Sequence, residues 1–236
     1  MNIRTTPNPV VRGAGRVLKQ LNDRHPWDHN QHFHRWILRS LPDPCARVLD
    51  VGCGRGDLIV ALAERGCSVD GIDPDPAMSD LAARRFREEP RVRITRATLQ
   101  QFERDASPAT QYDAITMVAS LHHMDLELAL GAARSLLRPG GRLLVVTLTA
   151  PLGLRDTVWD VGNALTNPLI GLIKHPRPAA GTSTVERMPV RDPEMGFAEL
   201  RERTGAVLPG ARLRRREGFR VTLAWQKPQG GSESVG

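Results

Sequence analysis

The chain of 236 residues is 40% hydrophobic and 25% charged, a balance typical of a water-soluble globular protein with one sizeable core. It has no run of about 18 to 20 apolar residues, and its first residues lack a hydrophobic signal core, so we expect no membrane span and a cytoplasmic location. The formal net charge is +7. Nearly all of the positively charged residues are arginines that are scattered along the chain, so nucleic-acid binding is not favoured.

Residues 1–44 are expected to form a helical cap. A helical pattern runs over 28–41 and places its apolar side chains on one face, and two prolines follow it. Three histidines, His25, His29 and His32, lie close to its start. No acid or thiol joins them at a ligand spacing, so we expect no metal there.

The N-terminal segment has two open interpretations. In the first it is a lid over the cofactor, with Trp27 and His29 facing the pocket and binding substrate. In the second, its helix only packs against the core.

The strongest local signal joins a buried strand to a helix through three alternate glycines. The strand, 47–51, carries Asp50 near its end, and Gly52, Gly54 and Gly56 follow it. Because a glycine has no Cβ, a ligand can lie directly against the backbone of such a turn.

A second strand, 68–72, ends in Asp73, nineteen positions after Gly54. A carboxylate at the tip of the second strand is suited to both hydroxyls of a ribose. The dinucleotide fingerprint needs its third glycine at position 57, which is Asp57 here, and Asp50 suits a positively charged amine better than a pyrophosphate. The two strand ends together predict a nucleoside-containing cofactor.

Strand and helix patterns continue in alternation along the rest of the chain. The expected helices are 56–65, 76–88, 126–137 and 193–204, and the further strands are 92–96, 114–119, 142–148, 211–217 and 219–226. This alternation predicts an α/β fold with a doubly wound, mostly parallel sheet and helices on both faces. The arginine-rich strand 211–217 is expected at or near an edge of this sheet.

Four motifs in this order resemble those of the class I S-adenosylmethionine-dependent methyltransferases. The matching stretches are 48–56, 71–74, 112–124 and 137–146. The resemblance implies a Rossmann-like, seven-stranded sheet that is completed by a C-terminal antiparallel hairpin. It divides the chain into the cap, a cofactor-binding core (45–149), a substrate-side insertion after the fifth strand (150–191), a helix with the hairpin (192–228) and a disordered tail (229–236).

The resemblance also implies S-adenosylmethionine as the cofactor and methyl transfer to an oxygen, nitrogen or carbon atom of a small molecule. Its first motif holds the methionine end, and the acid after the second strand holds the ribose. The implied cofactor-binding residues are Asp50, Gly52, Cys53, Gly54, Asp73, Pro74, Met78, Thr98 and Ala119. The family often has an acid after the third strand for the adenine amino group, and here Thr98 or a backbone carbonyl is expected to replace it.

Two histidines, His122 and His123, follow the fourth strand, where the resemblance puts the neighbourhood of the methyl group. A histidine titrates near neutral pH, so it could take a proton from a hydroxyl, an amine or an acidic carbon. Since neighbouring side chains alternate in direction, only one is expected to face the substrate, and we favour His123. The alternative is a histidine that caps the following helix or packs beneath the cofactor.

The insertion at 150–191 has an apolar periodic middle. We expect it to wall the substrate site, with Trp159 stacked on a flat apolar substrate. Core packing, or an interface between two copies of the chain in a homodimer, accounts equally well for the same pattern.

Three other function classes are alternatives to this one. A nucleobase amino-group methyltransferase is disfavoured, because the fourth strand is followed by Ala119-Ser120-Leu121-His122 rather than by an Asn or Asp with two prolines and an aromatic residue. A repurposed, non-methylating protein of the same fold, and an NAD-dependent oxidoreductase, remain as alternatives.

Overall fold

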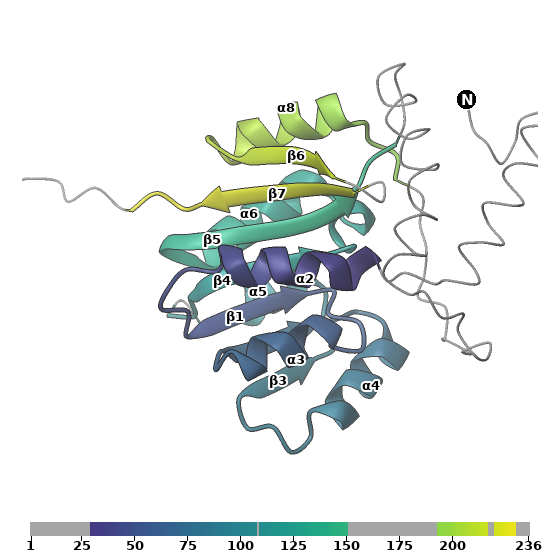
Figure 1. Cartoon of the computed structure of the whole chain (residues 1–236), viewed down its shortest axis with the longest axis vertical. Helices are drawn as coiled ribbons and strands as arrows, with labels where there is room; N and C mark the ends of the chain where they lie inside the picture. The colour runs from purple at the N-terminus through teal and green to yellow at the C-terminus, as the bar shows by residue number, and fades with distance from the viewer. Residues whose placement is uncertain (1–28, 108, 151–192, 217–219, 230–236) are drawn as a thin grey trace, which may run out of the picture.

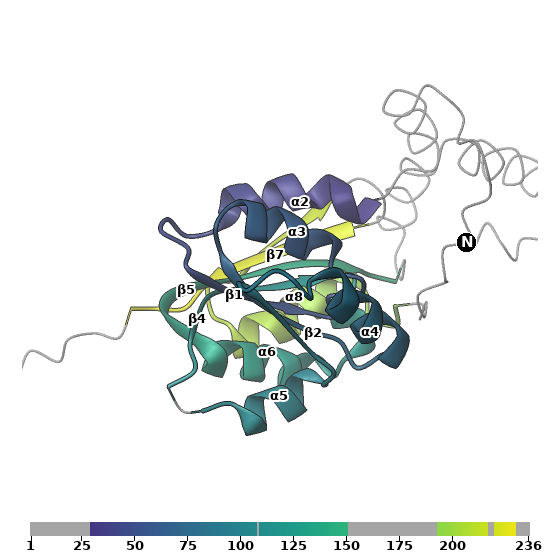
Figure 2. The ribbon, with the colours of Figure 1, turned by 90° about the horizontal axis from the view of Figure 1, so that it is seen from below.

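The computed structural model describes residues 29–107, 109–150, 193–216 and 220–229, which form a twisted β-sheet with helices on both faces (Figures 1 and 2). The strands are β1 (Arg47–Val51), β2 (Ser68–Ile72), β3 (Val92–Thr95), β4 (Tyr112–Val118), β5 (Leu137–Leu148), β6 (Arg212–Arg216) and β7 (Arg220–Gln226). Their order in the sheet is β3-β2-β1-β4-β5-β7-β6. Strand β7 runs antiparallel to β5 and β6, and all other pairs are parallel. The predicted fold class is confirmed.

Helices cover the two faces of the sheet in separate groups. They are α2 (His29–Ser40), α3 (Asp57–Glu64), α4 (Pro76–Arg85), α5 (Leu99–Asp105), α6 (Leu126–Leu136) and α8 (Phe197–Val207), with a short 3₁₀ turn, η1 (Leu121–His123). Figure 2 shows α2 and α3 on one face and α5, α6 and α8 on the other. None of the described helices is long and apolar enough to cross a membrane.

The strand order reverses between β1 and β4, since the chain runs outward to β3 and then returns to pair with β1 on its other side. In open α/β sheets, ligands bind beyond the carboxyl ends of the strands at such a reversal. The residues that follow β1, β2 and β4 therefore meet at one edge of the sheet, on the right in Figure 1.

The apolar face of α2 anchors this helix to the sheet. Phe33 and Ile37 are buried in one core cluster with Leu58 and Leu62 of α3. Each such side chain contributes about 1.5–3 kcal/mol when it is fully buried. A guanidinium hydrogen bond of 2.9 Å from Arg142 on β5 to the Ser40 carbonyl holds the end of the helix.

Three elements differ most from the sequence expectations. Helix α5 lies between β3 and β4, where no helix was expected. Strand β5 begins at Leu137 rather than 142, because its first residue pairs with Tyr112 before an irregularity in the register. Helix α8 begins at Phe197 rather than 193, after Gly196, which forms an isolated bridge with Ala150.

Several sequence predictions lie outside the described residues. They concern Trp27, the insertion with Trp159 and the homodimer interface considered for it, and nearly all of the predicted tail. The arginine-rich strand is β6, and it lies at the edge of the sheet as predicted.

Candidate active site

Two buried carboxylates lie at the carboxyl ends of neighbouring parallel strands. Asp50 on β1 is 3% exposed, and Asp73, directly after β2, is 8% exposed. The Thr116 hydroxyl on β4 donates a hydrogen bond of 2.7 Å to Asp50 Oδ1. The pKa of Asp50 is raised to about 7, mainly by burial and also by the charge of Asp73, while the Thr116 hydrogen bond opposes the rise. A positively charged ligand group beside Asp50 would favour its ionised form.

The glycine turn after β1 is bonded to the end of β2. The backbone N–H of Gly54 donates to Asp73 Oδ2 at 2.8 Å, and the N–H of Asp75 donates to Asp73 Oδ1 at 2.9 Å. The N–H groups of Gly52 and Cys53 both donate to the Ile72 carbonyl, at 2.8 and 3.0 Å. Asp73 is thus fixed in place, and each of its oxygens accepts one backbone N–H and keeps capacity for another donor.

Two of the three glycines are needed by the protein's own packing. Gly52 has φ +70°, and a Cβ there would lie 2.4 Å from the Cβ of Ser120. Gly56 has φ +83°, and its Cβ would lie 2.3 Å from Cε2 of Phe86. The sequence analysis predicts that the space left by the missing Cβ atoms of all three glycines is available to a ligand. At these two positions the space is instead taken by the side chains of Ser120, just after β4, and Phe86, just after α4.

The end of β4 has an unusual backbone. Ala119 has φ +55°, a left-handed conformation that costs a non-glycine residue roughly 1–2 kcal/mol. Its N–H donates to the Val146 carbonyl at 2.7 Å, and the next side chain, Ser120, donates to the Val51 carbonyl at 2.7 Å. These bonds tie the chain to β5 and β1 just before η1, so the direction of η1 is set by the sheet.

The remaining implied cofactor residues are spread around this edge. Pro74 is exposed beside Asp73, and Met78 is buried in the first turn of α4. Cys53 lies in the turn, but its thiol is buried in the apolar cluster beneath α2 and α3, and burial raises its pKa. Only the backbone of Cys53 is therefore suited to contact a ligand at the site.

Thr98 follows β3 and caps α5. Its hydroxyl oxygen accepts from the Gln101 N–H at 3.2 Å, and the Gln101 side chain accepts from the Thr98 N–H at 2.9 Å. This reciprocal pair is a capping box, which begins the helix that the sequence analysis missed. The side chain proposed for adenine thus already has a structural partner.

The two histidines of η1 have different surroundings. Their ring centroids are 4.1 Å apart with an angle of 38° between the planes. His123 is exposed, whereas His122 is half-buried and its Nδ1 is buried without a hydrogen-bond partner among the described residues. Burial, together with the charges of His123 and Arg220, lowers the pKa of His122 to about 4. The imidazole of His122 is therefore neutral at physiological pH.

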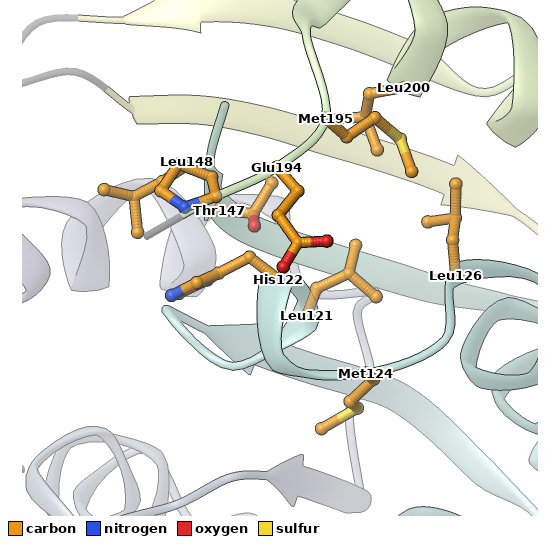
Figure 3. A pocket seen from close by; sticks show the side chains of 10 residues that line it. Leu121, His122, Met124, Leu126, Thr147, Leu148, Glu194, Met195 and Leu200 are labelled. Atoms are coloured by element: carbon orange, nitrogen blue, oxygen red, sulfur yellow. The ribbon is translucent and has the colours of Figure 1, made fainter. Parts of the chain in front are cut away.

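A cavity of about 130 Å³ adjoins His122, between η1, the end of β5 and the segment that leads into α8 (Figure 3). Thr147, which is 1% exposed, contributes a hydroxyl that has no partner among the described residues. His123, which the sequence analysis favoured, is not among the lining residues, and His122 is. Sequence reasoning missed Thr147, Met195 and Leu200 in this wall. A threonine inside the apolar run of β5 is a weak signal, and α8 reaches the cavity only through the tertiary fold.

Within the described part of the chain, no cluster of three histidine, cysteine or acidic side chains could hold a metal ion. His25 and the side chain of His29 lie outside that part, so the geometry of the N-terminal histidines is not described.

Comparison with known proteins identifies the family. A model of the methyltransferase domain matches residues 49–143, which include both carboxylates and η1. An uncharacterized methyltransferase of Mycobacterium tuberculosis is 34% identical over 208 residues, covering 86% of this chain and 98% of that protein. The chain belongs to the methyltransferase family. It is a class I S-adenosylmethionine-dependent methyltransferase, as the motifs predict, and the NAD-dependent alternative is not supported.

Other similar proteins agree with this assignment. A ubiquinone biosynthesis O-methyltransferase of Marinobacter nauticus is 38% identical over 133 residues, which are 56% of this chain and 54% of that protein. Among solved structures, the apo form of the methyltransferase SibL covers 84% of this chain and 55% of its own with a TM-score of 0.54 at 23% identity. An O-methyltransferase family protein from Burkholderia thailandensis covers 86% of this chain and 59% of its own, with a TM-score of 0.55 at 18% identity. These two solved structures have the same fold as this chain.

Proposed function

We propose that this methyltransferase holds S-adenosylmethionine between β1 and β2 and methylates a small molecule that lies beside η1. The observation that carries the proposal is the pair of buried carboxylates, Asp50 and Asp73, on either side of the glycine turn at the strand-order reversal. When bound, the cofactor supplies a methyl group on a positively charged sulfur, which reacts with a nucleophilic atom.

The residues at this edge fit the cofactor. Asp50 is buried and lacks a cation partner among the described residues, so an amino group beside it would offset the cost of its charge. Asp73 keeps acceptor capacity on both oxygens after its bonds to Gly54 and Asp75, which suits the two hydroxyls of a ribose. Pro74, next to this acid, and Met78, in the first turn of α4, are proposed to flank the adenine.

The proposed proton acceptor is His122 rather than His123. Its Nδ1 has no hydrogen-bond partner among the described residues, and its side chain lines the cavity. Its low pKa keeps the ring neutral at pH 7, so a ring nitrogen is unprotonated there, but it also makes the ring a weak base, so geometry rather than basicity supports this role. The atom that receives the methyl group is proposed to be oxygen, nitrogen or carbon of a small molecule. The name of the Marinobacter relative supports oxygen, although the match covers only about half of each chain.

Binding of S-adenosylhomocysteine tests the carboxylate assignment. Asp73→Ala should weaken this binding by about 1.5–3 kcal/mol in calorimetry, which is the scale of hydrogen bonds to a charged group. Asp73→Asn keeps the shape of the side chain, so it should lose less than Asp73→Ala. The matched control is Asp80→Ala, an exposed acid on α4, which should bind like the wild type. An unchanged affinity in Asp73→Ala would show that the ribose assignment is wrong.

A further inference from the structure

The cavity beside η1 has the size and lining of a small-molecule site. Its volume is about 130 Å³. An engineered cavity of roughly 150 Å³ in another protein accepts a benzene molecule, so a single six-membered ring approximately fills the volume found here. Leucine and methionine side chains, among them Leu126, Met195 and Leu200, form most of its wall (Figure 3).

Two residues of the cavity wall each have a buried polar atom without a hydrogen-bond partner among the described residues. The Thr147 hydroxyl and His122 Nδ1 are both buried, and neither makes a hydrogen bond within the described residues. A buried polar group without a partner costs about 1–3 kcal/mol. Because both residues line one cavity, a ligand that enters it and hydrogen-bonds to both atoms would remove both costs.

The chemistry of the wall favours an uncharged hydroxyl. A hydroxyl can donate one hydrogen bond and accept another, which matches a neutral imidazole nitrogen and a threonine side chain. The Glu194 carboxylate is directed toward His122 and Leu121 (Figure 3). No lysine or arginine is among the described lining residues, so none of them offsets a negative charge on a ligand, and Arg220, whose charge affects His122, lies outside the lining.

We propose that this cavity receives the methyl acceptor as a compact, uncharged, apolar group of about one ring, and that Thr147 and His122 recognise a hydroxyl on it. The proposal rests on the proposed function, because the acceptor must lie beside the cofactor site. Thr147 and His122 then determine specificity, because an apolar analogue of the same size leaves both polar atoms unpaired. A carboxylate meets no lysine or arginine among the described lining residues.

Three probes of similar size test this assignment: phenol, toluene and benzoate. Their dissociation constants are measured by ligand-observed NMR in the presence of saturating S-adenosylhomocysteine. Phenol should bind about three- to tenfold more tightly than toluene, the range expected for one net hydrogen bond, and benzoate should bind most weakly.

Substitutions of Thr147 and His122 test whether these residues cause the preference for phenol over toluene. Thr147→Val keeps the shape of the side chain without its hydroxyl, so phenol should lose most of its advantage while toluene is unaffected. His122→Phe should act similarly, and His122→Asn, which keeps a polar atom near Nδ1, should retain part of the preference. The matched control is Thr204→Val, because Thr204 on α8 is also buried with an unpartnered hydroxyl but lies outside the cavity wall. It should leave the phenol preference unchanged.

The outcomes separate this proposal from the proposed function. If S-adenosylhomocysteine does not bind the wild type, the proposed function is wrong. If it binds but phenol and toluene bind equally, or if Thr147→Val keeps the preference for phenol, the cavity assignment is wrong and the cofactor assignment stands. Tighter binding of benzylammonium than of phenol would also overturn the hydroxyl assignment and would indicate an amine paired with Glu194.

Discussion

Asp50 is an ordinary carboxylic acid placed among buried neighbours at the end of β1. Its pKa rises from 3.8 to about 7, first because burial disfavours the charged form and then because Asp73 is close by. Between these two values the folded protein holds a proton that the unfolded chain releases. The contribution of this proton to stability is therefore complete below about pH 4 and is lost as the pH rises through about 7.

The variant Asp50→Asn tests this linkage, because an amide stays neutral at every pH. Relative to the variant, the wild-type free energy of unfolding should fall by on the order of 2–4 kcal/mol between pH 4 and pH 8. Urea unfolding of both proteins at four pH values in this range gives the difference. Asp80→Asn, an exposed control on α4, should follow the wild-type curve. Parallel curves for Asp50→Asn and the wild type would contradict the raised pKa.

At the scale of elements, α5 depends on its capping box more than on its apolar face. The helix has seven residues, and only Leu99 is buried in it. Isolated helices of this length are unstable in water, so the first turn needs partners for its free N–H groups. Thr98 and Gln101 supply them reciprocally.

Thr98→Ala should lower the free energy of unfolding by about 1 kcal/mol, within the usual range of 0.5–2 kcal/mol for a lost N-cap. Thr98→Ser keeps the hydroxyl and should lose much less. Calorimetry with S-adenosylhomocysteine separates this role from the proposed adenine contact. Loss of stability with unchanged affinity would assign Thr98 to capping alone, whereas a tenfold loss of affinity would support the contact.

The same helix shows how far the sequence predicts the fold. Strands 47–51 and 68–72 have the predicted bounds, because buried parallel strands are short apolar runs with clear turns on both sides. Helix α5 was missed because its signal is a pair of polar residues rather than an apolar period. The first residues of β5 were missed because their pairing with Tyr112 is a long-range contact.

For the site, the prediction was better for the cofactor edge than for the cavity. Asp50 and Asp73 could be brought together from the sequence, because parallel strands of one sheet end at the same edge. Thr147, Met195 and Leu200 could not, because β5 and α8 meet only after a long intervening segment and no local pattern records which of their side chains share a wall. The difference between His122 and His123 likewise depends on the direction of η1, which the bonds of Ala119 and Ser120 set.

For the molecule as a whole, the raised pKa of Asp50 couples cofactor binding to the release of a proton from this side chain. With a pKa of about 7, Asp50 is about half protonated at pH 7 before binding. An amino group bound beside it favours the carboxylate, so binding of S-adenosylhomocysteine at pH 7 should release up to about half a proton per site, and little at pH 8.5.

Calorimetry in two buffers with different ionisation enthalpies measures this number directly, because the observed binding enthalpy changes with the buffer in proportion to the protons released. Asp50→Asn should bind with the same enthalpy in both buffers, while Asp80→Asn should release the same fraction as the wild type. Proton uptake, or release that persists in Asp50→Asn, would show that another group meets the amino end of the ligand. Since β1 and β4 together hold Asp50 through Thr116, the proton count reports on the assembled sheet edge rather than on either strand alone.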